Sequence, residues 1–164
     1  MKKTIALISI LLIAASIAAQ EKKLYDPAAD ADKDIDVLIK KARKEKKFIL
    51  IQGGGNWCGW CYEFVRFAKA DTQIDSVIKA GFIWYHLNYS KENENKKTLA
   101  RLAYPQRFGF PVFIILNEKG ERIHTQSSEY LEDGKKSYDK SKVQTFLEIW
   151  SPAAFNPKLY EEKG

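Results

Sequence analysis

The sequence predicts an α/β fold in which a central mixed sheet of about four strands has helices on both faces. Three short apolar runs, rich in isoleucine and aromatic residues, have the composition of buried strands. Longer stretches with apolar residues at helical spacing lie between these runs. Strands that alternate with helices favour parallel pairing, and a turn after the third run predicts a final antiparallel hairpin.

The first half of the pattern begins with a helix. Residues 34–47, DIDVLIKKARKEKK, place four apolar side chains on one helical face: Ile35, Leu38, Ile39 and Ala42. The run KFILIQ at 47–52 predicts the first strand, which the glycine triplet at 53–55 is expected to break. A second helix is expected to start at 56–58, and its inner face carries Cys61, Phe64, Val65 and Ala68.

The second half repeats the alternation. A short helix at 73–81 is expected to end at Gly81, and FIWYHLNY at 82–89 predicts the second strand. Residues 91–109 indicate a polar helix with an apolar stripe, broken near Pro105. The remaining elements are a third strand at 111–117, a turn at 117–120, a hairpin strand at 121–126, a loop at 127–139 and a closing helix at 140–150 that stops near Pro152.

The N-terminus is typical of an export signal. Lys2 and Lys3 precede an apolar, uncharged run that ends in small residues, so residues 1–19 are interpreted as a signal peptide cleaved after Ala18 or Ala19. We expect a periplasmic protein, with secretion or tethering by an uncleaved signal as alternatives. The rest divides into a lead-in segment at 20–33, one domain at 34–151 and a tail at 152–164.

The charge of the chain does not favour a polyanionic partner. The net charge of +6 falls by two when Lys2 and Lys3 leave with the signal. The densest basic run, KKARKEKK at 40–47, is interpreted as the solvated face of the first helix rather than a patch for nucleic acid or membrane. We therefore expect no nucleic-acid partner.

The only two cysteines, Cys58 and Cys61, lie in the stretch GGGNWCGWCYEF. A bridge between them closes too short a loop to stabilise the fold much, although disulfides persist in exported proteins. A helix N-terminus favours an anion, so a thiolate at Cys58 is expected to have a lowered pKa. Cys61 lies one turn further on the inner face. The spacing predicts disulfide exchange, with Cys58 as nucleophile and Cys61 as resolving thiol.

The segment FILIQGGGNWCGWC at 48–61, together with FGFPVFIIL at 108–116, resembles the thioredoxin superfamily. The resemblance covers roughly residues 34–150, and the chain is most similar to exported bacterial proteins of the thioredoxin-7 or disulfide-interchange type. It implies a three-layer thioredoxin-like fold and a redox-active Cys58–Cys61 disulfide in a W-C-G-W-C active site. It also implies a cis-proline at Pro111 beside the cysteines, with the backbone of Phe110 offered to an extended substrate segment.

The resemblance further implies a thiol–disulfide oxidoreductase that needs no cofactor. Its partners would be proteins with disulfides or thiols, and a membrane thiol carrier would exchange electrons with it. The direction of electron flow and the oligomeric state stay open, with reduction or interchange favoured over strong oxidation.

Three positions depart from the thioredoxin pattern. Gln52 stands where these proteins carry a buried acid, and an amide cannot accept the proton of the resolving thiol. Trp60 replaces the usual proline between the cysteines and brings no charge. Tyr62 replaces a lysine that often follows the second cysteine.

Aromatic residues near the cysteines are expected to form the substrate groove. Trp57 and Trp60 flank Cys58, which is expected to be exposed, and apolar partner segments could bury area against their rings. With Gly59, Phe110 and Pro111 they make up the predicted substrate-binding set. Tyr104 and Phe108 are the other aromatic residues expected near the site, whereas Trp84, Trp150 and the remaining phenylalanines are assigned to the core.

Two other functions are weighed against exchange. A non-catalytic binding module would keep the disulfide permanently oxidised, and a metallochaperone would hold a soft ion on the thiolates. Zinc needs about four ligands, and the only histidines, His86 and His124, lack ligand-like spacing, so no metal is expected. The glycosylation sequon at Asn88 is interpreted as a coincidence.

Overall fold

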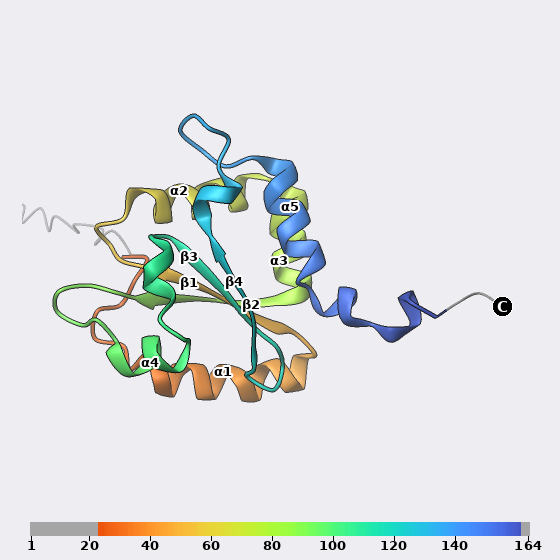
Figure 1. Ribbon diagram of the computed structural model, residues 1–164, viewed down its shortest axis with the longest axis horizontal. Helices are drawn as coiled ribbons and strands as arrows, with labels where there is room; N and C mark the ends of the chain where they lie inside the picture. The colour runs from red at the N-terminus through yellow and green to blue at the C-terminus, as the bar shows by residue number, and fades with distance from the viewer. Residues whose placement is uncertain (1–22, 162–164) are drawn as a thin grey trace, which may run out of the picture.

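The computed structural model describes residues 23–161, so the predicted signal peptide lies outside the described residues. Figure 1 shows a sheet sandwiched between helices, which confirms the predicted mixed sheet with helices on both faces. The strand order is β2-β1-β3-β4. The strands are β1 (Phe48–Gly54), β2 (Phe82–Asn88), β3 (Val112–Leu116) and β4 (Arg122–Ser127). Within the described residues, no helix has the length and apolar character needed to cross a membrane.

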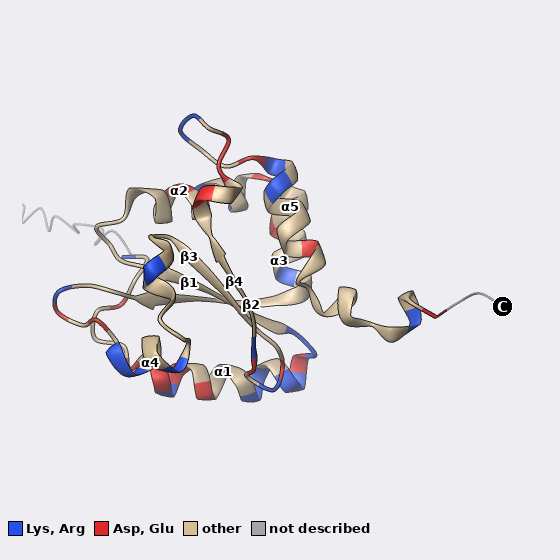
Figure 2. Ribbon diagram, viewed as in Figure 1, with Lys and Arg blue, Asp and Glu red and all other residues tan. Residues whose placement is uncertain are grey.

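One face of the sheet is covered by α1 (Ala31–Glu45) and α4 (Lys96–Arg101) (Figure 1). The inner stripe of α1 packs on the isoleucines of β1 and β3 that point to this side. The helix begins at Ala31 because the Asp30 side chain accepts from Lys33 N–H and caps it. Figure 2 shows basic and acidic residues interspersed along α1, in keeping with a solvated surface, and basic residues on α4 beside it.

The other face is covered by α2 (Gly59–Ala70), α3 (Thr72–Gly81) and α5 (Lys140–Ile149). Its core is aromatic: Phe64 of α2 lies 4.3 Å from Phe113 and 5.0 Å from Tyr138, centroid to centroid. Trp84 and Trp150 pack against this core but stay half-buried. The assignment of Phe155 to the core is wrong: it is 48% exposed, because it follows α5 in a short tail that lies outside the main layers.

The direction of β3 differs from the expectation of parallel pairing. β2 runs parallel to β1, whereas β3 is antiparallel to it, with Val112 opposite Gly53. Val112 lies at the end of the sheet where β2 ends, since it pairs with Gly53 and Asn88 pairs with Gly54. A parallel β3 would need a return along β2, a seven-residue strand of about 23 Å. The six residues of α4 cover only about 9 Å of that length, and the chain instead enters β3 at the end of the sheet where β2 ended.

The connection from β2 to β3 is less helical than predicted. Of residues 91–109, only α4 and a 3-10 turn at Pro105–Phe108 are helical. The side chains of Asn88, Asn93 and Asn95 bond to backbone carbonyls and so compete with a helix here. The sequon residue Asn88 is 2% exposed and donates to the Asn93 carbonyl, so it is not available for glycosylation in the folded protein.

Candidate active site

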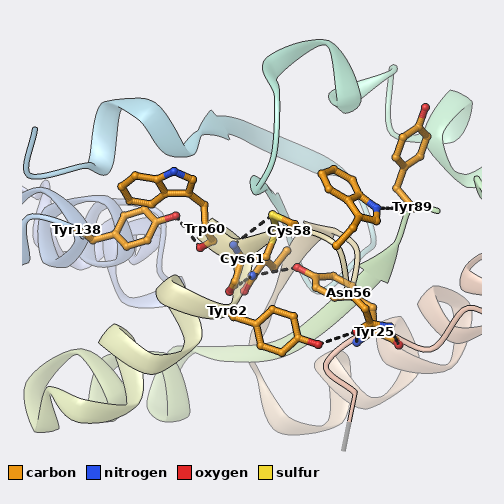
Figure 3. Close-up of a disulfide and its surroundings, with 10 residues drawn as sticks. Tyr25, Asn56, Cys58, Trp60, Cys61, Tyr62, Tyr89 and Tyr138 are labelled. Atoms are coloured by element: carbon orange, nitrogen blue, oxygen red, sulfur yellow. Dashed lines mark hydrogen bonds between the residues drawn. A yellow bond between two sulfur atoms is a disulfide. The ribbon is translucent and has the colours of Figure 1, made fainter. Parts of the chain in front are cut away.

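The two cysteines form a disulfide at the N-terminus of α2 (Figure 3). Cys58 is the N-cap, and its Sγ accepts from the Cys61 amide at 3.2 Å. Cys61 is completely buried, and Cys58 is only 4% exposed. The expectation of an exposed Cys58 is therefore wrong, because the cysteine pair packs against Tyr25 and Phe110. The N–H groups of the first turn of α2 still lie where an anion at Cys58 would be stabilised.

The glycines before the cysteines continue the strand instead of breaking it. β1 runs through Gly54, which pairs with Asn88 of β2. A Cβ on Gly54 would lie 2.7 Å from Tyr25 Oη and would overlap Cys61 Sγ. A Cβ on Gly53 would lie 3.0 Å from a methyl group of Val112. These residues are glycine because the disulfide and its neighbours approach the strand backbone closely.

Tyr25, from the predicted lead-in segment, is a site residue that sequence reasoning missed. Its side chain is completely buried in a cluster with Cys58 and Cys61. Asn56, two residues before Cys58, binds both backbone groups of Tyr25, as Figure 3 shows. One signal was present in the sequence: an aromatic residue two positions before Pro27 in an otherwise polar stretch. The stretch around Tyr25 has no hydrophobic periodicity, so the sequence does not indicate where this side chain packs.

Gln52 lies behind the disulfide at the position where the resemblance expected an acid. It is completely buried in β1, and its Nε2 donates both to Tyr25 Oη at 3.0 Å and to the Cys61 carbonyl at 2.9 Å. Burial raises the pKa of Tyr25 far above its usual range, so the phenol is neutral. The described residues therefore place two neutral polar groups, Gln52 and Tyr25, behind Cys61.

His86 is the register partner of Gln52 on β2. Its ring meets Tyr25 edge-on at a centroid distance of 5.6 Å and packs at a tilt against Trp84 at 5.2 Å. Burial, with a smaller contribution from Lys69, lowers the pKa of His86 to about 4, so the imidazole is neutral at pH 7. Within the described residues, neither His86 Nε2 nor Gln52 Oε1 has a hydrogen-bond partner.

The Phe110–Pro111 bond that precedes β3 is cis. Pro111 is buried, and Phe110 is half-buried against the cysteine cluster. The Phe110 ring lies between two aromatic neighbours: it stacks on Tyr89 at 5.0 Å and meets Trp57 edge-on at 5.4 Å. The structure thus brings the residues around Pro111 to the same end of the sheet as the disulfide.

The two tryptophans of the motif lie on different sides of the disulfide. Trp57 is 59% exposed, and its Nε1 donates to the Tyr89 carbonyl at 2.8 Å. A surface hollow of about 410 Å³ opens beside these two residues. Trp60 is half-buried, packs edge-on against Tyr138, and accepts at its carbonyl from Tyr138 Oη at 3.1 Å (Figure 3). The expected single groove is thus two aromatic patches, with Gly59 exposed between them.

The histidines do not join the cysteines in a metal site. His86 lies on β2 and His124 on β4, which are the two opposite edges of the sheet. His124 instead stacks on Trp150 at 4.1 Å. In residues 23–161, no three His, Cys, Asp or Glu side chains are grouped so that they could hold a metal ion.

Comparison with known proteins gives similarity of fold. No protein-family model matches the chain, and no curated protein matches it. Among solved structures, a disulphide isomerase from Xylella fastidiosa Temecula1 has a TM-score of 0.67 at 18% identity, covering 86% of this chain and 99% of that one. A thioredoxin from Thermus thermophilus has a TM-score of 0.53 at 14% identity, covering 77% and 93%. The chain therefore has the thioredoxin fold.

Proposed function

We propose that this protein is an exported thiol–disulfide oxidoreductase of the thioredoxin superfamily. One observation carries the proposal: the only two cysteines of the chain are bonded across the first turn of α2, at the same end of the sheet as a cis-proline. A bridge of this sequence separation contributes little as a staple, so an exchange role accounts for it better. The thioredoxin fold is consistent with that role.

In this proposal Cys58 is the nucleophile and Cys61 the resolving thiol. Cys58 caps the helix, and the Cys61 amide that now points at its sulfur would stabilise a thiolate there. Cys61 is completely buried, whereas Cys58 retains some exposure. A partner sulfur therefore reaches Cys58 first, and Cys61 attacks from behind.

The proposed cycle passes two electrons to the partner. The Cys58 thiolate attacks a partner disulfide, the Cys58–partner bond forms, and the partner's other sulfur leaves as a thiolate that takes up a proton. Cys61, as a thiolate, then attacks Cys58 Sγ. The Cys58–Cys61 disulfide forms, and the partner's second sulfur leaves and takes up the proton that Cys61 lost. A membrane thiol carrier would reduce the disulfide again.

The substrate would bind as an extended segment beside Pro111. The backbone of Phe110 and the exposed ring of Trp57 lie on one side of the disulfide, and Trp60 lies on the other. Exposed aromatic rings favour apolar segments of unfolded or partly folded proteins, because such segments bury area on them. We propose disulfide reduction or interchange in such proteins, and the similarity of fold to the Xylella disulphide isomerase is consistent with interchange.

The proposed location is the periplasm, reached through a signal at residues 1–19. Fractionation of a producing bacterium, with N-terminal sequencing of the product, tests this part by itself. A chain that begins at Met1 in the membrane fraction would favour the tethered alternative.

Turnover assays on cysteine variants test the activity. With dithiothreitol as donor, the wild type is expected to reduce insulin, and Cys58→Ala to abolish this. Cys61→Ala is expected to keep a reactive Cys58 that alkylates at neutral pH and traps partners as mixed disulfides. A highly reactive thiol in Cys58→Ala, with an unreactive one in Cys61→Ala, would reverse the roles. Absence of turnover with every donor would contradict the activity.

The low exposure of Cys58 favours one alternative, a binding module with a permanent disulfide. The potential of the Cys58–Cys61 couple against glutathione separates the two functions. A potential far below that of the compartment would support the binding module.

A further inference from the structure

The hydroxyl of Tyr25 lies close to the sulfur of Cys61. The two residues belong to one buried cluster, and both atoms crowd the point that a Cβ on Gly54 would occupy. That point is 2.7 Å from Tyr25 Oη and still nearer to Cys61 Sγ. Tyr25 is completely buried, so water does not compete for its hydroxyl.

The hydrogen bonds around Gln52 decide how the hydroxyl of Tyr25 is used. The Cys61 carbonyl can only accept, so the bond to it at 2.9 Å fixes which end of the Gln52 amide is the nitrogen. The same nitrogen donates to Tyr25 Oη at 3.0 Å. This bond uses a lone pair of the phenol and leaves its proton free to donate. Among the described residues, no oxygen or nitrogen accepts that proton.

We propose that Tyr25 donates a hydrogen bond to Cys61 Sγ when the disulfide is open, and so stabilises the reduced site in which Cys61 is a thiolate. A disulfide sulfur and a neutral thiol are weak acceptors, whereas a thiolate accepts a charge-assisted bond. The bond therefore strengthens when two electrons enter the couple and Cys61 loses its proton. Tyr25 keeps its proton throughout, and the proton that Cys61 loses on closure goes to the departing partner thiolate. The inference rests on the proposed function for its role in the cycle.

The site itself holds the segment that carries Tyr25. Asn56 binds the backbone of Tyr25, and the Tyr62 hydroxyl accepts from Leu24 N–H at 3.3 Å and donates to Asn56 Oδ1 at 2.8 Å. Tyr62 thus helps to dock the segment, but its side chain is 40% exposed and lies outside the buried cysteine cluster. This difference provides a matched control.

The test is the potential of the Cys58–Cys61 couple in Tyr25→Phe and Tyr62→Phe, measured by equilibration with glutathione. Loss of the Tyr25 hydroxyl is expected to make reduction of the disulfide about tenfold less favourable, which corresponds to about 30 mV. Tyr62→Phe removes a docking bond. The equilibrium constant for reduction of the disulfide in this variant is expected to stay within twofold of the wild-type value.

Two results would overturn the inference: an unchanged potential in Tyr25→Phe, or equal shifts in both variants, since the latter would assign the effect to docking alone. If Tyr25→Phe does not fold, Gln52→Met takes its place. It removes the amide that orients Tyr25 Oη, and a potential that stays or rises would again overturn the inference. The potential is measurable without any substrate, so a wild type that lacks turnover would contradict the proposed function and not this role of Tyr25.

Discussion

Asn56 holds Tyr25 through both atoms of its side-chain amide. Its Oδ1 accepts from the Tyr25 N–H at 3.0 Å, and its Nδ2 donates to the Tyr25 carbonyl at 2.8 Å. Asn56 lies two residues before Cys58, so the segment before α1 and the loop before α2 are joined where the disulfide forms. The order of this N-terminal segment therefore depends on the active-site loop.

Replacing Asn56 by Ala is expected to lower the free energy of unfolding by about 1–3 kcal/mol, because two partly buried backbone groups lose their partners. Urea titration measures the change. Asn156→Ala is the control: that side chain caps only an exposed turn at Lys158, and its loss is expected to cost less than about 0.5 kcal/mol. Equal stability of the two variants would show that the Asn56–Tyr25 pairing contributes nothing.

Gly54→Ala is expected to destabilise the oxidised protein by about 1–3 kcal/mol, since the added methyl group would collide with Cys61 Sγ and Tyr25 Oη. Gly59→Ala is the matched control. It lies in the first turn of α2 with nothing within 4 Å of its Cβ, and a better helix former there is expected to be neutral or slightly stabilising. Thermal unfolding of both variants measures the change in stability. A Gly54→Ala variant as stable as the wild type would contradict the close packing.

The sequence was sufficient to predict most helices and strands and the position of the cysteine pair, because both depend on local signals. Hydrophobic spacing located the strands and the larger helices, and the spacing of Cys58 and Cys61 places them one helical turn apart wherever the helix packs. The direction of β3 was not local: it depends on the end of the sheet at which the chain re-enters after β2. Tyr25 was missed for the same reason, since only the packed fold brings it against Cys61 and brings His86 against its ring.

His86 is expected to make stability fall with acid over a defined range. Its pKa is about 4 in the folded protein, below the value of about 6.5 for a free histidine. Between these values the unfolded chain binds a proton that the folded protein does not, so stability is lost as the pH falls from about 6.5 towards 4. The loss at pH 4.5 relative to pH 8 is roughly 2 kcal/mol.

His86→Phe isolates this contribution, because a phenylalanine can still pack against Tyr25 and Trp84 and does not titrate. Urea unfolding of both proteins from pH 8 to 4.5 is the measurement. Protonation of carboxylates with lowered pKa values, such as Asp32 and Asp71, destabilises both proteins at low pH. Their contribution to the free energy of unfolding therefore cancels in the difference between the two proteins. Parallel curves for the two proteins would show that His86 is not protonated differently on unfolding.

Replacement by Ala is expected to affect substrate turnover at Trp57 and stability at Trp60. Trp57 is 59% exposed, so Trp57→Ala should change the free energy of unfolding by less than about 0.5 kcal/mol. It should nevertheless slow the reduction of protein substrates severalfold, while exchange with glutathione, which is too small to use the aromatic surface, stays the same. Trp60 packs on Tyr138 and the core behind it, so Trp60→Ala should cost about 2 kcal/mol. Turnover of insulin and of glutathione, with urea titration of each variant, separates the two roles. If Trp57→Ala slows both substrates equally, its ring acts on the disulfide itself and not on the bound chain.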